Sequence, residues 1–374
     1  MQTKVLKISD TGAPNHRDLE EAAATLDSGG LVAFPTETVY GIACRVQSRS
    51  LKRLDKVKGR GSDKRYTLHV GDKNGVAEFV PHRSLKVRRL VERAWPGPLT
   101  VVFRLDDADL DEQRRRLPRE VFEGLYQDAS IGIRCPDHPV ASSLLRLTTH
   151  PVVAPSANPS DRPPAREGQQ VFDYFEGKID LILDAGPCRH GRSSTVVRAS
   201  HRGLEVVREG VYDRRTLEAW AHVRLLFVCT GNTCRSAMAE GLCRQDLARR
   251  LGCRVDDLAS VGYSVRSAGT ADIVGMPAST GALAACSTLG VDIRSHRSRG
   301  LSVPLIEESD LVFVMEDMHR ETVLALCPQA ADRCMALDPD GEIDDPIGQP
   351  LEVFHRCAHQ IQRAIEKRVG EQVL

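Results

Sequence analysis

The sequence lacks the features that mark exported, membrane-spanning or strongly charged proteins. Its first ten residues, MQTKVLKISD, contain no apolar segment typical of a signal peptide, and no apolar run is long enough to cross a bilayer. The 51 basic side chains balance the 51 acidic ones, so no overall positive field favours nucleic acid or a membrane surface. We therefore expect a cytoplasmic protein with no membrane partner.

The cysteines lack the spacing of a disulfide framework or a zinc site. Eleven of them are scattered through 374 residues, and no two form a Cys-x2-Cys pair. An odd, scattered set in a chain without an export signal is typical of reduced thiols. We expect no metal site, and a reducing compartment suits a cysteine that works as a nucleophile.

The sequence also has no internal repeat and no low-complexity tract. Its length predicts two domains, and a hydrophobic content of 41% is sufficient for their cores. The junction is expected between a strand-like segment at 204–208 and an apolar run that begins at Leu225. This places the first domain at residues 1–211, a linker at 212–222 and the second domain at 223–374.

Helix-like and strand-like segments alternate irregularly in the first domain. The predicted helices cover residues 15–30, 50–58, 84–94 and 139–147. The predicted strands lie at residues 31–34, 67–70, 101–103, 131–134, 152–154, 181–184, 194–197 and 204–208. This pattern is typical of an α/β domain with a mixed, twisted sheet and flanking helices.

Polar side chains collect at the ends of these strands. They carry hydroxyl, amide and cationic groups: Thr36, Thr38, Lys58, Arg60, His69, Arg134, Ser156, Asn158, Ser194, Thr195 and Arg208. Such groups suit a ligand with both phosphate and carboxylate, although no Walker loop and no G-x-G-x-x-G is present. For Lys58 and Arg60 alone, a solvated basic helix end is the simpler interpretation.

Six motifs carry more information than these groups alone. They are FPTETVYGIA (34–43), KGR (58–60), WPGPLT (95–100), GIRCPDHP (132–139), APSANPS (154–160) and SSTVV (193–197). With them, most of residues 12–210 resembles the threonylcarbamoyl-adenylate synthase (YrdC-like) family. The resemblance implies ATP, L-threonine and bicarbonate as substrates, and threonylcarbamoyl-AMP and pyrophosphate as products. It also implies a role in making threonylcarbamoyladenosine in tRNA, with tRNA-modification machinery as a partner.

The resemblance also assigns residues. The positions that it implies for ATP and its phosphates are Lys58, Arg60, Ser156, Asn158, Ser194 and Arg208, and those for threonine are Thr36, His69 and Arg134. Mg²⁺ would share in neutralising the phosphates. After Lys-Gly-Arg the family usually continues with proline, whereas this chain has Gly61, so the contacts of residues 64–67 stay open.

Residues 225–240, LLFVCTGNTCRSAMAE, organise the second half of the chain. An apolar run suits a buried parallel strand, Cys229 follows it, and Arg235 and Ser236 open a helix. The loop between them is Thr230, Gly231, Asn232, Thr233 and Cys234. Amide groups in a tight loop and at a helix start attract anions, and the same field favours a thiolate. The pattern predicts a nucleophile, Cys229, and a phosphate clamp, Arg235.

In this interpretation Ser236 hydrogen-bonds the thiolate and Asn232 braces the loop. The simplest alternative is a buried cysteine before an ordinary strand-to-helix turn. Further strand-like and helix-like segments alternate up to a terminal helix at 351–369, which predicts a doubly wound parallel sheet. A cysteine phosphatase also needs an acid for its leaving group, and Asp345 and its rival Asp344 are both candidates.

VCTGNTCRSAMAE, SAGT, GMPAS and DDPIG resemble the low-molecular-weight protein tyrosine phosphatase family, over about residues 223–370. The resemblance selects Asp345 as general acid and implies a phosphorylated protein substrate and no cofactor. A phosphotyrosine pocket needs aromatic walls, which this half scarcely offers. Thr233 stands where an aliphatic residue is usual and resembles the protein-arginine phosphatase branch, so phosphoarginine is favoured and phosphotyrosine stays possible.

Three alternatives to a bifunctional enzyme remain. The first domain could be a degenerate RNA- or nucleotide-binding module, but its nucleotide-site residues are intact. The phosphatase domain could be an inert regulatory module, but its nucleophile, clamp and acid are intact. It could also be arsenate reductase-like, but residues 315–323 carry no cysteine, and Cys327 and Cys334 come later.

Overall fold

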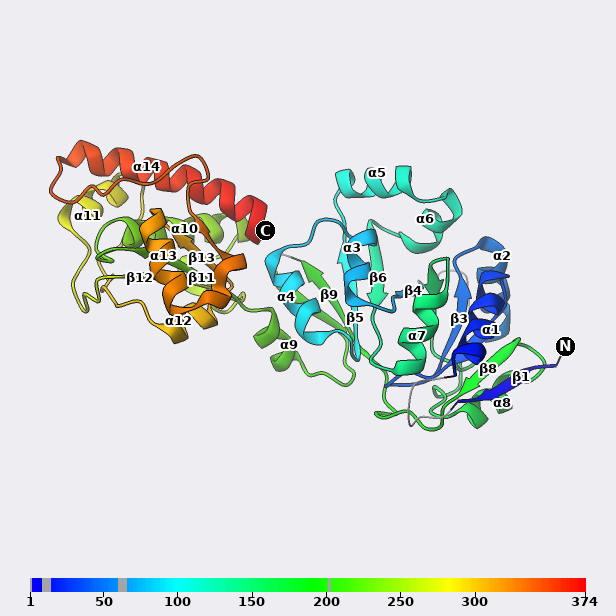
Figure 1. Cartoon of the computed structure of the whole chain (residues 1–374). Helices are drawn as coiled ribbons and strands as arrows, with labels where there is room; N and C mark the ends of the chain where they lie inside the picture. Colours follow the sequence, from blue (N-terminus) through cyan, green and yellow to red (C-terminus); the bar gives the residue numbers. More distant parts are fainter. Residues whose placement is uncertain (1, 9–14, 60–65, 201–202) are drawn as a thin grey trace. The chain divides into compact units, whose positions relative to one another are not determined.

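The computed structural model describes residues 2–8, 15–59, 66–200 and 203–374, which form two compact units (Figure 1). The first is built mainly from residues up to Trp220 and the second mainly from Ala221–Leu374. The predicted linker 212–222 overlaps a helix, α9 (Arg214–Ala221), and the residue-level domain boundaries stay a prediction. No helix among the described residues is long and apolar enough to cross a membrane.

The first unit contains a ten-stranded mixed sheet, in the order β1-β8-β2-β3-β7-β4-β6-β5-β9-β10. The sheet contains both parallel pairs such as β4–β6 and antiparallel pairs such as β5–β6, so the predicted mixed sheet is confirmed. The strands are β1 (Lys4–Lys7), β2 (Val32–Phe34), β3 (Gly41–Arg45), β4 (Thr67–His69), β5 (Leu99–Arg104), β6 (Ser130–Arg134), β7 (Val152–Val153), β8 (Leu181–Asp184), β9 (Thr195–Ser200) and β10 (Gly203–Arg208).

The helices of this part of the chain are α1 (His16–Asp27), α2 (Ser48–Lys58), α3 (Val76–Phe79), α4 (Leu85–Ala94), α5 (Asp107–Arg116), α6 (Arg119–Leu125), α7 (Pro139–Leu147) and α8 (Gly168–Phe175). The start of α4, up to Arg89, belongs to the second unit. Leu19, Ala22, Ala23 and Leu26 form one helical stripe, which explains why α1 packs beside α7 on the core of β2 and β8. The side chain of Asn15 accepts a hydrogen bond from the Arg17 N–H and caps α1.

The sequence analysis missed several short elements of this unit. β1, α3, α5, α6 and α8 were not predicted, and β3 was taken as part of the segment that leaves β2. β3 lies antiparallel to β2, with Phe34 opposite Gly41. A turn of only six residues therefore connects two core strands, and it carries Thr36 and Thr38 into the interior.

The second unit is a four-stranded parallel sheet in the order β12-β11-β13-β14, as the predicted doubly wound sheet requires. Its elements are β11 (Val223–Cys229), α10 (Arg235–Leu251), β12 (Tyr263–Gly269), α11 (Thr280–Thr288), α12 (Val303–Glu308), β13 (Leu311–Val314), α13 (Asp317–Leu326), β14 (Cys334–Ala336) and α14 (Leu351–Arg368). Helices α10, α11 and α14 pack on one face, and α12 and α13 pack on the other (Figure 1).

The loop between β11 and α10 has little room on one side. A Cβ atom at Gly269 would lie 2.6 Å from the carbonyl oxygen of Thr230 and 3.0 Å from the amide nitrogen of Asn232. The neighbouring strand β12 must therefore end in glycine for the loop to keep its path.

We predict that Gly269→Ala displaces this loop. Overpacking of a close contact costs about 1–3 kcal/mol, so the urea unfolding midpoint of the second unit should fall. Gly341→Ala is the matched control, because a Cβ there meets nothing within 4 Å. Equal midpoints for the two variants would contradict the prediction.

Candidate functional sites

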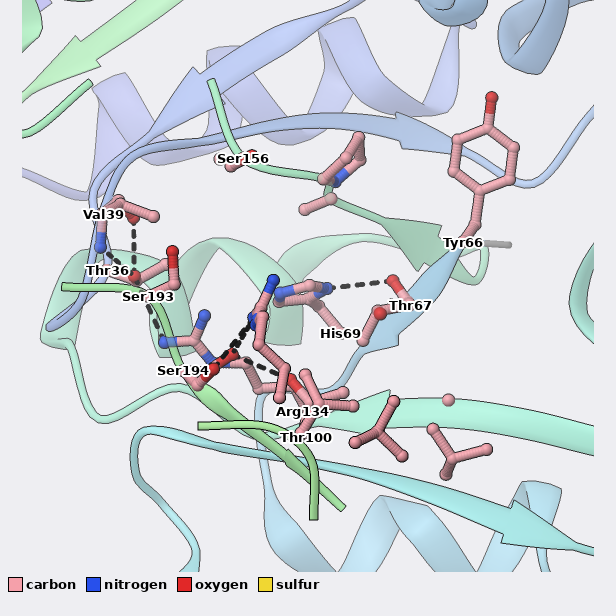
Figure 2. A pocket seen from close by; sticks show the side chains of 18 of the residues that line it. Thr36, Val39, Tyr66, Thr67, His69, Thr100, Arg134, Ser156, Ser193 and Ser194 are labelled. Carbon is pink, nitrogen blue, oxygen red and sulfur yellow. Dashed lines mark hydrogen bonds between the residues drawn. The ribbon is translucent and has the colours of Figure 1, made fainter. Parts of the chain in front are cut away.

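A cavity of about 450 Å³ opens in the first unit (Figure 2). Six of the predicted ligand residues line it: Thr36, His69, Arg134, Ser156, Ser194 and Arg208. They come from the turn after β2, from strands β4, β6 and β10, from the loop after β7 and from the loop before β9. Lys58 and Asn158 contact the lining loop but are not part of the lining, and Arg60 lies outside the described residues.

Arg134 is the most constrained cation of this cavity, with 6% of its surface exposed. Its Nη2 donates to Glu37 Oε1 at 2.8 Å, to Thr38 Oγ1 at 2.7 Å and to Thr36 Oγ1 at 3.3 Å. Its buried Nε has no hydrogen-bond partner among the described residues. Because an unpaired buried donor is unfavourable, this edge of the guanidinium is suited to a ligand oxygen.

His69 stands beside Arg134 as a neutral ring. Burial, with the positive charge of Arg134, lowers the pKa of His69 to about 3. Its Nδ1 lies 3.0 Å from the carbonyl oxygen of Thr67, and a carbonyl can only accept, so Nδ1 carries the proton. Nε2 is then an acceptor rather than a donor, which suits an ammonium or hydroxyl group of a ligand.

Ser194 and Arg208 form a second polar group in the cavity wall. Arg208 Nη2 donates to the carbonyl oxygen of Ser194 at 2.9 Å and approaches its Oγ at 3.3 Å. The Ser194 hydroxyl also lies 3.1 Å from Thr100 Oγ1. Burial lowers the pKa of Arg208, and the positive charge of Arg134 lowers it further. Because these two positive charges repel each other, an anionic ligand between them would be bound favourably.

The position of Lys58 corrects an interpretation that was made from the residues alone. A solvated basic helix end was the simpler interpretation, but Lys58 is only 5% exposed. Its Nζ donates to the carbonyl oxygens of Ser156 and Asn158, the latter at 2.7 Å. The Ser156 hydroxyl donates to Asn158 Oδ1 at 2.6 Å, so the loop is braced from within as well. Lys58 therefore holds the loop that carries Ser156 into the cavity.

In the second unit, the predicted nucleophile is fully enclosed. Cys229 is 2% exposed, and its Sγ lies 2.9 Å from Ser236 Oγ and 3.3 Å from the amide nitrogen of Asn232, which donates to it. Both contacts suit a negatively charged sulfur. The structure thus brings Cys229 and Ser236 together, as the sequence analysis expected.

Asn232 braces the loop as expected, and through more contacts than the sequence indicated. Its φ of 53° lies in the left-handed region, which asparagine tolerates better than most residues. Its Nδ2 donates to Ser236 Oγ and Ser267 Oγ, both at 2.8 Å, and its Oδ1 accepts from the Arg299 amide at 2.9 Å. A side chain with both donor and acceptor is needed to make all three hydrogen bonds.

Arg235 is 1% exposed and is held by two carboxylates. Its Nη1 donates to Glu316 Oε2 and, at 2.9 Å, to the Ile343 carbonyl, and its Nη2 donates to Asp345 Oδ2 at 2.6 Å. Its buried Nε has no partner among the described residues, as in Arg134. Both Asp344 and Asp345 are exposed, but Asp345 is the one whose carboxylate contacts Arg235, so the geometry favours Asp345.

Sequence reasoning missed two residues beside this arginine, Glu316 and His319. His319 is fully buried, its Nδ1 accepts from the Glu316 amide at 3.2 Å, and its Nε2 lies 2.9 Å from Thr230 Oγ1. Burial lowers the pKa of His319, and the charge of Arg235 adds to this. Their position directly after β13, at the carboxyl end of a parallel strand, is the signal that could have identified them.

Neither site contains a dedicated metal cage. No group of three or more His, Cys, Asp or Glu side chains suited to a metal ion occurs in the part of the chain that the structure describes. The 450 Å³ cavity is lined by hydroxyl, imidazole and guanidinium groups, without a carboxylate in its lining. Its lining residues therefore do not fit a protein-held Mg²⁺, which prefers oxygen ligands such as carboxylates and phosphates.

The geometry defines the class of protein: an α/β protein with a cationic ligand cavity in one unit and a cysteine phosphatase-type loop in the other. The chain belongs to the Sua5/YciO/YrdC family, described as "Telomere recombination", whose sequence profile matches residues 24–210. Residues 224–373 match the profile described as "Low molecular weight phosphotyrosine protein phosphatase".

Individual relatives support the first assignment. A threonylcarbamoyl-AMP synthase of Bacillus subtilis is 33% identical over 222 residues, or 59% of this chain and 61% of that relative. The chain thus matches less than two thirds of that relative's length. One from Marinobacter nauticus is 32% identical over 47% of this chain and 88% of its own length. A Pyrococcus abyssi Sua5 structure complexed with L-threonine, 20% identical, covers 98% of both chains with a TM-score of 0.51, which indicates a shared fold.

The neutral state of His69 predicts a pH dependence of stability. The unfolded ring binds a proton below about pH 6.5, whereas the folded ring stays neutral down to about pH 3. Stability of the first unit should therefore fall as the pH falls through this window, by roughly 2 kcal/mol between pH 7 and pH 5. His69→Gln should remove this contribution.

Urea unfolding of the full chain in a Trp220→Phe background tests this, because the buried Trp95 then reports on the first unit. Carboxylates contribute equally to both proteins, so the difference between their pH profiles isolates His69. Parallel profiles for the parent protein and its His69→Gln variant would contradict a neutral buried ring.

Proposed function

We propose that the chain is a bifunctional enzyme. The first unit forms L-threonylcarbamoyl-AMP from ATP, L-threonine and bicarbonate, for threonylcarbamoyladenosine modification of tRNA. The second unit removes phosphate from a phosphorylated protein through Cys229. One observation supports the synthase activity above all: Arg134, Arg208 and a neutral His69 line the same cavity.

The cavity residues can divide the first reaction between them. Arg134 binds the threonine carboxylate through its unpaired edge, and His69 Nε2 accepts a hydrogen bond from the threonine ammonium or hydroxyl. The threonine amine attacks bicarbonate with loss of water, and the carbamate oxygen then attacks the α-phosphorus of ATP. Pyrophosphate leaves, and Arg208, Ser194 and the Lys58 region stabilise its charge. Mg²⁺ bound to the ATP phosphates would share in neutralising their charge.

Release of pyrophosphate tests this function. The full chain should release pyrophosphate from ATP only when threonine and bicarbonate are both present. Lys58→Ala should abolish this release, because Lys58 holds the Ser156 loop and lies beside the phosphate region. Lys56→Ala is the matched control, since Lys56 is exposed in the same last turn of α2.

Two results would contradict the assignment. Turnover of ATP without threonine would indicate a different reaction. Binding of ATP or RNA by the folded chain without pyrophosphate release would favour the alternative of a degenerate binding module.

The second unit offers a two-step displacement. Cys229 Sγ attacks phosphorus, Asp345 protonates the leaving atom, and Asp345 then accepts a proton from the water that hydrolyses the thiophosphate. Arg235 exchanges its contact with Asp345 for the phosphate, which frees the carboxyl group for proton transfer. The contact distances around Cys229 and Arg235 support these roles and oppose an inert regulatory module.

The phosphatase substrate is proposed to be phosphoarginine rather than phosphotyrosine. Residues 221–374 contain only four Phe, Tyr or Trp side chains, and these are buried: Phe227, Tyr263, Phe313 and Phe354. No aromatic wall is left for a phosphotyrosine ring, whereas the half-buried Thr233 places a hydroxyl beside the loop. The arsenate reductase alternative is opposed because Cys327 and Cys334 pack in the core on the sheet face opposite Cys229.

Matched phosphopeptides test the preference. The wild type should show a higher kcat/KM for phosphoarginine than for phosphotyrosine, and Thr233→Ile should narrow or reverse the ratio. Thr288→Ile, exposed on α11, should leave the ratio unchanged. A phosphotyrosine preference that Thr233→Ile does not alter would mean that Thr233 does not select the substrate.

A further inference from the structure

Glu37 is a buried carboxylate that the assigned functions do not use. Its side chain has no exposed surface, and its two oxygens have different partners. Oε1 accepts from Arg134 Nη2 at 2.8 Å, and Oε2 accepts from the amide of Asp137 at 3.1 Å. Its own carbonyl accepts from the amide of His190 at 2.8 Å. Glu37 therefore ties the turn after β2 to two other segments of the cavity wall.

These contacts fix the Nη2 end of the Arg134 guanidinium and leave its Nε donor without a hydrogen bond in the described part of the chain. Nη2 is engaged by Glu37, Thr36 and Thr38, while the buried Nε has no partner among the described residues. The Thr36 hydroxyl is itself committed, since it donates to the Val39 carbonyl at 2.7 Å. It cannot replace Glu37 as a charge partner, so without Glu37 the guanidinium would be a buried cation with neutral neighbours.

Charge compensation also bears on which anion Arg134 attracts. A guanidinium paired with a carboxylate keeps its directional donors but exerts a weaker field at longer range. Such a group favours a singly charged, planar carboxylate over a multiply charged phosphate. Arg208 of the same cavity donates instead to Ser194, a neutral residue.

We propose that Glu37 is a positioning and specificity residue: it orients Arg134 for the carboxylate of threonine and keeps phosphate groups away from it. The proposal rests on the proposed function of the first unit. Arg134 would then serve the amino acid and Arg208 the phosphates, although both line one cavity. Glu37 itself need not touch either substrate.

Glu37→Gln in the full chain tests the proposal. Glutamine keeps the size of the side chain, but its single oxygen cannot accept from both Arg134 and Asp137, and it carries no charge. In the pyrophosphate assay we expect the KM for threonine to rise about 10-fold or more, with a smaller change in kcat. Millimolar inorganic phosphate, added as a probe, should become competitive with threonine in Glu37→Gln and not in the wild type.

Two further variants separate charge from position. Glu37→Asp keeps the charge but shortens the reach, so the threonine KM should rise without competition by phosphate. Asp137→Asn is the matched control, because it removes only the exposed pair with Arg189 at 2.9 Å; its threonine KM should stay within about twofold of the wild type.

The outcomes are distinct. An unchanged threonine KM in Glu37→Gln, or in Glu37→Asp if the glutamine variant does not fold, overturns the proposal while the proposed function stands. Loss of the folded state in both Glu37 variants, seen in melting curves, assigns Glu37 a purely structural role and also overturns it. A wild type without threonine-dependent pyrophosphate release overturns the function and the proposal together.

Discussion

Burial of an arginine is the constraint on which both sites depend. A guanidinium cannot lose its charge, so a buried one needs carboxylate or carbonyl partners. Arg134 meets this need with Glu37, and Arg235 meets it with Glu316 and Asp345. In both residues Nε is buried without a partner among the described residues, so each guanidinium is anchored at its tip and keeps an unpaired donor along one edge. That edge is where an anion can add hydrogen bonds without moving the anchor.

The two folds supply this anchoring in different ways. In the second unit, strand β11 ends at Cys229 and helix α10 starts at Arg235, so the loop lies at the carboxyl edge of a parallel sheet. Glu316 arrives at the same edge because it follows the neighbouring strand β13. In the first unit the sheet is mixed, and the site is assembled from turns and strands of both directions. Its order therefore depends on long-range contacts such as Arg134–Glu37, which join residues 97 positions apart.

These differences explain how much of each site the sequence could predict. Cys229, Asn232, Arg235 and Ser236 lie within one strand, loop and helix start, and local spacing located them. Glu316 and His319 were not located, although they follow a strand, since their link to the loop depends on the order of strands in the sheet. From the residues alone Lys58 was interpreted as solvated, because a basic helix end usually is, whereas here it is buried and donates to two loop carbonyls. The α/β architecture of both units was predicted. Most of the helices and strands that were missed are short, or do not end at one of the polar motifs.

In the proposed function, the second site has to bind an anion beside its own carboxylates. In the structure Arg235 donates to Glu316 and Asp345, so binding of phosphate at Nη2 replaces one anion with another. The exchange alone adds little binding energy, because the hydrogen bond to Asp345 must be broken first. Net attraction then has to come from the amides of the loop, from the start of α10 and from the unpaired Nε. Glu316 stays on Nη1 throughout, so the guanidinium can change partner at one end without losing its orientation at the other.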